Sequence, residues 1–196
     1  MEGRREEILD VVLDFLAQPQ SGQSLTINNI AKHANLAKSS IYEYFTDKTT
    51  MIVEALSRLI DKNTQTLLMM ESFDNLDFND AFSQHIERFL SLGENNQMMH
   101  TYMRHPMVAT LPDDEKQRIH VLFKSAMQKV QARYYAIIQK GIDENILRDD
   151  VPLERKRTVE ALLLGGVVAL NSPHNDWDKS RQINDLLQST ITLYNS

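Results

Sequence analysis

The scarcity of helix-breaking residues constrains the fold of this chain most. Its 196 residues include only six glycines and five prolines, the residues that most often interrupt or end a helix. No run of alternating β-branched residues is typical of a strand, whereas apolar residues recur at the three- and four-residue spacing of amphipathic helices. The sequence therefore predicts an all-α protein of about nine helices.

Composition narrows the class of protein. Apolar residues make up 42% of the chain and charged residues 24%, as in globular proteins with a buried core. The absence of cysteine excludes disulfides, thiolate metal sites and cysteine nucleophiles. The N-terminus has no signal-peptide pattern, and the longest apolar run, residues 161–170, is shorter than the roughly 20 residues that span a bilayer. We expect a cytoplasmic protein that does not enter the membrane.

Breaks in the apolar pattern predict the helix order and two domains. Helical segments are expected up to the break at residues 19–22 and then at 27–34, 38–45, 47–70, 79–92, 97–108, 112–142, 154–170 and 176–194. We expect a small three-helix domain over residues 1–48, followed by a larger helical domain over residues 49–196.

The segment TINNIAKHANLAKSSIYEYFTDK, residues 26–48, has the features of two short helices joined by a tight turn. Thr26 offers a hydroxyl cap to the first helix, and Asn35 tolerates the left-handed backbone that ends it. Ile41 and Phe45 lie four residues apart and should both face inward. Polar side chains then remain outside at the start of the second helix. This arrangement is typical of a helix-turn-helix.

Such an outward face suits DNA. In a helix-turn-helix the second, recognition helix enters the major groove by its N-terminal residues, where lysines, hydroxyls and tyrosines can bind phosphates and base edges. Asp47 should cap the next helix, so that Lys48 and the amides beside it favour a phosphate. The predicted DNA-binding residues are Thr26, Lys38, Ser39, Ser40, Tyr42, Tyr44 and Lys48.

The net charge of −6 limits this interpretation. Residues 1–50 carry five Lys and Arg against seven Asp and Glu, so DNA binding must depend on the local placement of a few groups rather than on bulk charge. A helical protein that binds small molecules and has no role on DNA remains the alternative.

The same segment resembles the DNA-binding signature of the tetracycline-repressor (TetR) family. The positions that match in type and spacing are Thr26, Ile30, Ala31, Ala34, Tyr42, Tyr44, Phe45 and Lys48. The resemblance is specific over about residues 5–55 and extends beyond them only as a layout of helices, with a similar turn at residues 141–150. Asn35 replaces the family's turn glycine, and Ala37 replaces its usual serine cap, a change that weakens the helix start by roughly 1 kcal/mol.

The resemblance implies a homodimer that binds a palindromic double-stranded DNA operator. Its two recognition helices would lie one turn of DNA apart, about 34–36 Å. Most members of the family repress, and a small molecule in the C-terminal domain moves the recognition helices to a spacing that no longer fits. An activator of the same family is the alternative.

The methionines suggest where an effector would bind. Seven of nine lie between Met69 and Met127, and methionine suits adaptable apolar surfaces. With the aromatic residues nearby they predict a pocket for an apolar or aromatic effector, although helical apolar spacing is equally typical of a plain core. The candidate pocket residues are Phe89, Met99, Tyr102, Met103, Phe123, Met127 and Tyr134.

The run ALLLGGVVAL, residues 161–170, predicts a helix that is apolar all round and must be buried against another surface. Its paired glycines lower helix stability unless close packing compensates. The family layout favours a dimeric four-helix bundle with the last helix, and burial within one chain is the alternative. The candidate interface residues are Leu162, Gly165, Gly166, Ala169, Leu186 and Leu187.

No arrangement of residues indicates catalysis. The chain has no glycine-rich phosphate loop, GxSxG elbow or HExxH motif. His100 and His105 lie five residues apart and so do not share a helix face. Neither has a neighbouring cysteine or a suitably spaced carboxylate. We expect a protein that is not an enzyme and needs no metal or cofactor.

Overall fold

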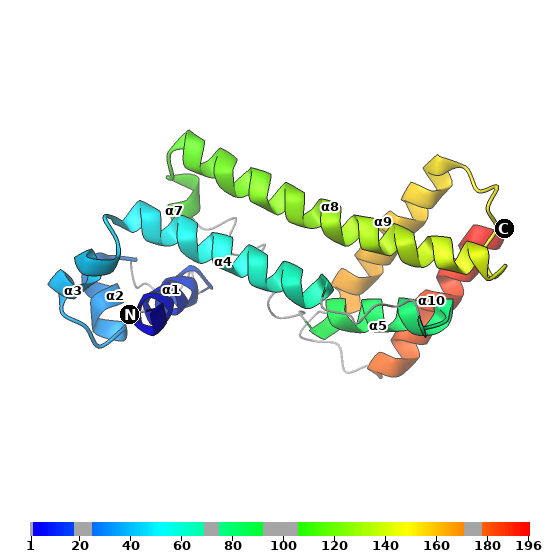
Figure 1. Cartoon of the computed structure of the whole chain (residues 1–196), viewed down its shortest axis with the longest axis horizontal. Coiled ribbons are helices and arrows are strands. Elements are labelled where there is room, and N and C mark those ends of the chain that lie inside the picture. Colours follow the sequence, from blue (N-terminus) through cyan, green and yellow to red (C-terminus); the bar gives the residue numbers. More distant parts are fainter. Residues whose placement is uncertain (1, 18–24, 69–74, 92–105, 171–177) are drawn as a thin grey trace. The chain divides into compact units, whose positions relative to one another are not determined.

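The computed structural model describes residues 2–17, 25–68, 75–91, 106–170 and 178–196, and the elements within these ranges are helices (Figure 1). This confirms the predicted all-α fold. The helices are α1 (Glu2–Ala17), α2 (Ile27–His33), α3 (Lys38–Tyr44), α4 (Lys48–Leu68), α5 (Phe78–Ser91), α7 (Pro106–Ala109), α8 (Asp113–Asp143), α9 (Leu153–Leu170) and α10 (Lys179–Asn195). None of these described helices combines the length and apolarity needed to cross a membrane.

The chain divides into two compact units. Unit 1 comprises residues 1–63 and 96–126, and unit 2 comprises residues 64–95 and 127–196. Helices α4 and α8 each begin in unit 1 and end in unit 2. The predicted boundary after residue 48 is a different one, because it separates a DNA-binding part from a part for dimerisation and effector binding. That functional boundary stays a prediction.

Unit 1 has a core that α1, α2, α3 and α4 build together, and α1, α2 and α3 gather near the start of α4 (Figure 1). Its fully buried members include Ile8, Leu16, Ile30, Ile41 and Met51. Burying one such side chain contributes roughly 1.5–3 kcal/mol, so this core can hold helices that are too short to be stable alone.

The turn after α2 fixes how α3 follows it. Asn35 has a φ of 53°, the left-handed conformation predicted from the sequence. The Leu36 amide donates to the Ala31 carbonyl (2.9 Å), and the Asn35 amide donates to the Lys32 carbonyl (3.3 Å). These are the two bonds of a Schellman motif, and Leu36 packs against the unit 1 core. The turn is therefore defined by its backbone, without a glycine.

Unit 2 buries aromatic and aliphatic side chains of α5, α9, α10 and the second part of α8, among them Phe78, Phe82 and Tyr194. A second Schellman turn follows α8 at Asn145, whose φ is 59°. A Cβ added to Gly141 would approach the Phe78 ring to 2.8 Å. This glycine is therefore required for the close packing of α8 on the start of α5.

Candidate nucleic-acid interface

Helix α3, the predicted recognition helix, depends on its surroundings for stability. It has only seven residues, and Ala37 at its N-cap makes no side-chain hydrogen bond. Isolated helices shorter than about 12–15 residues are marginal in water. Ile41, which is fully buried, and Phe45, at 3% exposure, attach α3 to the core of unit 1. The prediction that these two residues face inward is confirmed.

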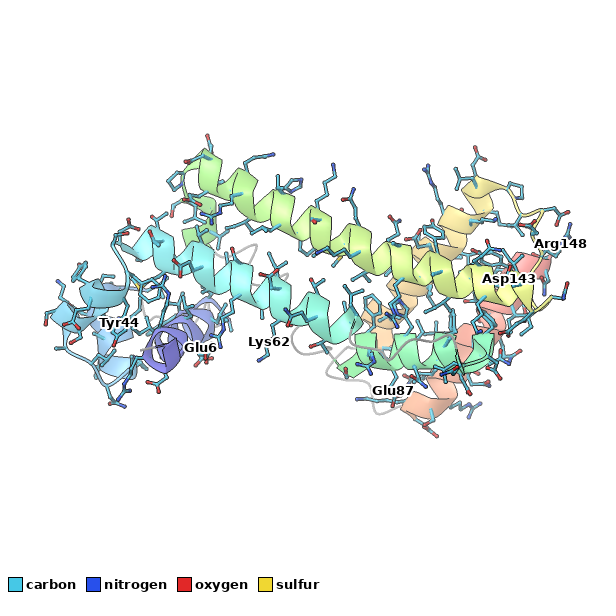
Figure 2. All side chains as sticks on the ribbon, viewed as in Figure 1. Glu6, Tyr44, Lys62, Glu87, Asp143 and Arg148 are labelled. Atoms are coloured by element: carbon cyan, nitrogen blue, oxygen red, sulfur yellow. The ribbon has the colours of Figure 1, made fainter. Side chains whose placement is uncertain are left out.

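The opposite side of α3 is polar and exposed. Lys38 and Ser39 are exposed, and 51% of Tyr42 is accessible to solvent. Ser40 is half-buried, and Tyr44 is half-buried with its side chain packed against the core. Figure 2 shows the side chains of unit 1 as sticks, with Tyr44 of α3 labelled. The first turns of α3 thus present an ammonium, hydroxyls and an aromatic ring, whereas Tyr44 also serves the fold.

Thr26 and Lys48 flank this surface in sequence. The Thr26 hydroxyl accepts the Asn29 amide at 3.2 Å and caps α2, as predicted. Because a hydroxyl that accepts one bond can still donate its own hydrogen, Thr26 can also bind a phosphate oxygen. Lys48 begins α4 and is half-buried. Both groups suit contacts to the DNA backbone.

Asp47 caps α4, as the sequence predicts. Its carboxylate accepts the Thr50 amide at 2.8 Å and the Thr50 hydroxyl at 3.1 Å. The hydrogen bond from the Thr50 backbone is the main reason why the pKa of Asp47 lies below its ordinary value. A permanent negative charge therefore lies beside Lys48, and Glu43 adds another exposed carboxylate on α3. The local charge is mixed, as the composition predicts.

Arg5 on α1 joins the end of α3 to α4, a contact that sequence reasoning missed. Its Nη1 donates to the Tyr44 carbonyl at 2.7 Å, and its Nη2 donates to both oxygens of Glu54 at 2.7 and 2.6 Å. Its Cζ lies 4.5 Å from the centroid of the Phe45 ring. Residues 5 and 54 are distant in sequence, and no local spacing rule connects them.

Arg58 forms a second bridge between α4 and α1. Its Nη1 donates to the Asp10 carboxylate at 2.8 Å and to the Glu6 carbonyl at 3.2 Å. Because Glu54 and Arg58 are four residues apart, they lie on the same face of α4. Two ion pairs hold that face to α1. The cation is on α1 in one pair and on α4 in the other.

The predicted effector residues lie in different surroundings. In unit 2, Phe89 is half-buried and Tyr134 is 5% exposed. Phe123 packs against the core of unit 1, and Met127 is 39% exposed. Met99, Tyr102 and Met103 lie outside the described residues, as do His100 and His105. The pocket stays a prediction.

Unit 2 also contains a buried histidine that the sequence did not single out. His85 is 2% exposed and lies edge-on to the Phe89 ring, with ring centroids 5.1 Å apart. Burial, and secondly the positive charge of Arg133, lower the pKa of His85 to about 4. The imidazole is therefore neutral at ordinary pH, next to a predicted pocket residue.

The predicted dimer residues on α9 differ in exposure. Leu162 is 57% exposed, Gly165 and Ala169 are exposed, and a Cβ at Gly165 would have nothing within 4 Å. Gly166 is half-buried, and a Cβ there would lie 2.9 Å from the Leu186 side chain of the same chain. Leu186 is half-buried and Leu187 is 6% exposed. Leu162, Gly165 and Ala169 thus form an accessible strip of small and apolar groups.

The comparisons with known proteins agree with this geometry. Residues 21–55 match a family model described as bacterial regulatory proteins, tetR family. The matched range includes α2, the turn at Asn35 and all of α3. No curated protein matches the chain.

Solved structures resemble the whole chain. A putative transcriptional regulator, TetR family protein, from Vibrio parahaemolyticus is 16% identical with a TM-score of 0.67, and 97% of each chain is covered. A TetR transcription regulator from Haloarcula marismortui is 17% identical with a TM-score of 0.65, covering 100% of this chain and 98% of that one. A putative TetR-family transcriptional regulator from Rhodococcus sp. is 15% identical with a TM-score of 0.63, covering 99% and 100%. At these identities the likeness concerns the fold.

Proposed function

We propose that this chain is a TetR-family transcriptional regulator, which binds a palindromic DNA operator as a homodimer and is released by a small molecule; the family match over residues 21–55 and the similar solved folds support this. In this proposal residues 1–48 bind DNA, and residues 49–196 dimerise and bind the effector. The protein acts in the cytoplasm as a repressor and catalyses no reaction.

The observation that carries the proposal is the two-sided character of α3. One side buries Ile41 completely, and the other presents Lys38, Ser39 and the half-exposed Tyr42. A helix in a tight helix-turn-helix whose first turns carry exposed donors has the form that enters the major groove. Lys48 and the Thr26 hydroxyl supply backbone contacts beside it.

The exposed strip on α9 supports dimerisation. Leu162 is 57% exposed, and Gly165 and Ala169 on the same side of α9 are also exposed; an accessible apolar strip favours a protein partner. A homodimer covers such a strip with the same strip of a second copy, and Gly165 and Ala169 allow the two helices to approach closely.

The interior of unit 2 supports an effector with aromatic or apolar character. Phe89 and Tyr134 provide ring surface, and the neutral His85 beside Phe89 provides one polar group. Ligand sites of regulators commonly combine an apolar lining with a few polar groups that fix orientation.

Selection of bound sequences from a random DNA pool tests this function. We expect enrichment of an inverted repeat whose half-site centres lie about one helical turn apart. A gel shift with that sequence, followed by a compound screen, should find ligands that lower the affinity. Failure to enrich any sequence, with a ligand still bound in unit 2, would support a small-molecule-binding protein without a role on DNA.

A further inference from the structure

The C-terminal end of α3 has no charge of its own to stabilise it. The last carbonyls of a helix lack intrahelical partners, and cations are favourable there because the helix dipole is negative at that end. The last turn of α3 contains no basic residue. The Tyr44 carbonyl, the final one of α3, accepts the guanidinium of Arg5 at 2.7 Å. A cation for this helix end therefore comes from α1.

The same guanidinium also contacts Glu54 and Phe45. It donates to both carboxylate oxygens of Glu54 and lies over the face of Phe45, the residue that ends α3. The planar fork of arginine can form two parallel bonds to a carboxylate and stack on a ring at once. One side chain thus connects three helices, and a change in its position must change the end of α3.

We propose that Arg5 is a positioning residue for operator binding, which holds α3 at the angle that the major groove requires through its contacts to Tyr44 and Glu54. The inference rests on the proposed DNA-binding function. In this role Arg5 contacts no phosphate. Its contribution to DNA affinity depends on the shape of the guanidinium and on Glu54, and its positive charge alone is insufficient.

Glu54 makes the proposal testable. When its carboxylate is removed, a pure charge effect and a positioning effect predict changes in DNA affinity of opposite sign. Removing a carboxylate near DNA should strengthen binding if only charge matters. If Glu54 holds Arg5 in place, Glu54→Gln should weaken binding instead. Arg5→Lys makes a second separation, since lysine keeps the charge but cannot reproduce the fork or the stacking.

Arg58 provides the matched control. It also forms an ion pair between α4 and α1, and its side chain is 31% exposed compared with 40% for Arg5. Its hydrogen-bond acceptors, Asp10 and Glu6, lie on α1. Arg58→Gln therefore removes a comparable bridge between these helices without removing a bond to the end of α3.

The experiment measures the affinity and salt dependence of all four full-length variants on the selected operator. We expect Arg5→Gln, Arg5→Lys and Glu54→Gln each to lose about tenfold in affinity, the effect of one charge-assisted hydrogen bond. The slope of log affinity against log salt should remain that of the wild type, because no phosphate contact is removed. Arg58→Gln should stay within about twofold.

Several results would overturn the inference. Wild-type affinity in Arg5→Lys, with a shallower salt slope in Arg5→Gln, would assign Arg5 to a phosphate. Tighter binding by Glu54→Gln would show that only charge matters. Equal losses in Arg5→Gln and Arg58→Gln would indicate a general effect of the α1–α4 bridges.

A measurement without DNA separates this inference from the proposed function. Amide hydrogen exchange at Tyr44 and Phe45 should be faster in Arg5→Gln than in Arg58→Gln. If wild type enriches no DNA sequence, the proposed operator binding fails, and the proposal for Arg5 as a DNA-positioning residue fails with it. If wild type binds its operator but exchange and affinity are unchanged in Arg5→Gln, only the inference fails.

Discussion

Helix α3 of unit 1 and helix α9 of unit 2 expose side chains of opposite character. Unit 1 places the apolar side of α3 inside, at Ile41, and holds charged groups such as Arg5 and Arg58 in partly exposed ion pairs. Unit 2 buries the polar side chain of His85 and exposes Leu162 and Leu164 of α9. An exposed polar face favours a polar partner, and the exposed strip of Leu162, Gly165 and Ala169 favours another apolar protein surface. The difference therefore supports the proposal in which unit 1 meets DNA and unit 2 meets a second copy.

The contrast between the two units is tested most directly at Leu162. A substitution there should have the largest effect of those considered, on the dissociation constant of the dimer. Leu162→Glu would place an unpaired carboxylate in the proposed dimer interface, at a cost of roughly 3 kcal/mol or more. Since 1.4 kcal/mol corresponds to a factor of ten, the dissociation constant of the dimer should rise at least about a hundredfold. Sedimentation over a range of concentrations measures it.

Val121→Glu is the matched control for Leu162→Glu. Val121 is 53% exposed on α8, close to the 57% of Leu162, and it is not among the predicted interface residues. The control should associate like the wild type. If both variants dissociate equally, or if neither does, the α9 strip is not the dimer surface.

The second prediction tests the buried histidine of unit 2, His85. Burial and the nearby charge of Arg133 lower the pKa of His85 to about 4, whereas an unfolded histidine titrates near 6.5. Below pH 6.5 the unfolded chain binds a proton that the folded chain excludes, so stability is fully present above this pH and falls towards pH 4. The titration of His85 should lower the free energy of unfolding by about 2 kcal/mol between pH 7 and pH 5.

Urea unfolding of wild type and His85→Phe at several pH values measures this cost. The variant should lose less stability between pH 7 and pH 5 than the wild type, whatever its stability at pH 7. Parallel pH profiles would mean that His85 is protonated in the folded protein, and the description of unit 2 as a unit with a neutral buried histidine would be wrong.

The third prediction concerns the polar face of unit 1. Because Tyr42 is 51% exposed, Tyr42→Ala should leave the fold intact and weaken the preferred operator about tenfold, as expected for one base contact. Its preference among operator variants should also change. Lys48→Ala is the comparison, and it should weaken all sequences alike and reduce the salt slope. A uniform loss in Tyr42→Ala would place its side chain on the DNA backbone.

The features predicted correctly from the sequence are those with local causes. The Thr26 cap, the left-handed Asn35 and the Asp47 cap each involve groups within four residues, and the structure contains all three. Residue type and spacing determine such contacts, so the helix-turn-helix could be predicted almost completely.

The features that were missed depend on the packing of distant segments. Arg5 and Glu54 meet only because α1 and α4 pack together, and the burial of His85 depends on the core of unit 2. Apolar spacing predicted that α9 is buried but did not show that Gly166 faces Leu186 of its own chain while Gly165 faces open space. Helical periodicity identifies a face and does not identify its partner.

The smallest effect is expected at the N-cap of α3. It tests whether contacts with the rest of unit 1, rather than a cap, stabilise this helix. Ala37 already has the extended backbone of an N-cap residue, with φ −71° and ψ 149°, so Ala37→Ser can supply the missing cap without a backbone change. The free energy of unfolding should rise by about 0.5–1 kcal/mol, with slower hydrogen exchange at Ser39 and Ser40. Ala132→Ser, at an exposed position inside α8, should give no gain, because serine favours caps over helix interiors. Equal effects at both positions would show that the start of α3 needs no cap, and that packing at Ile41 and the contacts of Arg5 suffice to hold it.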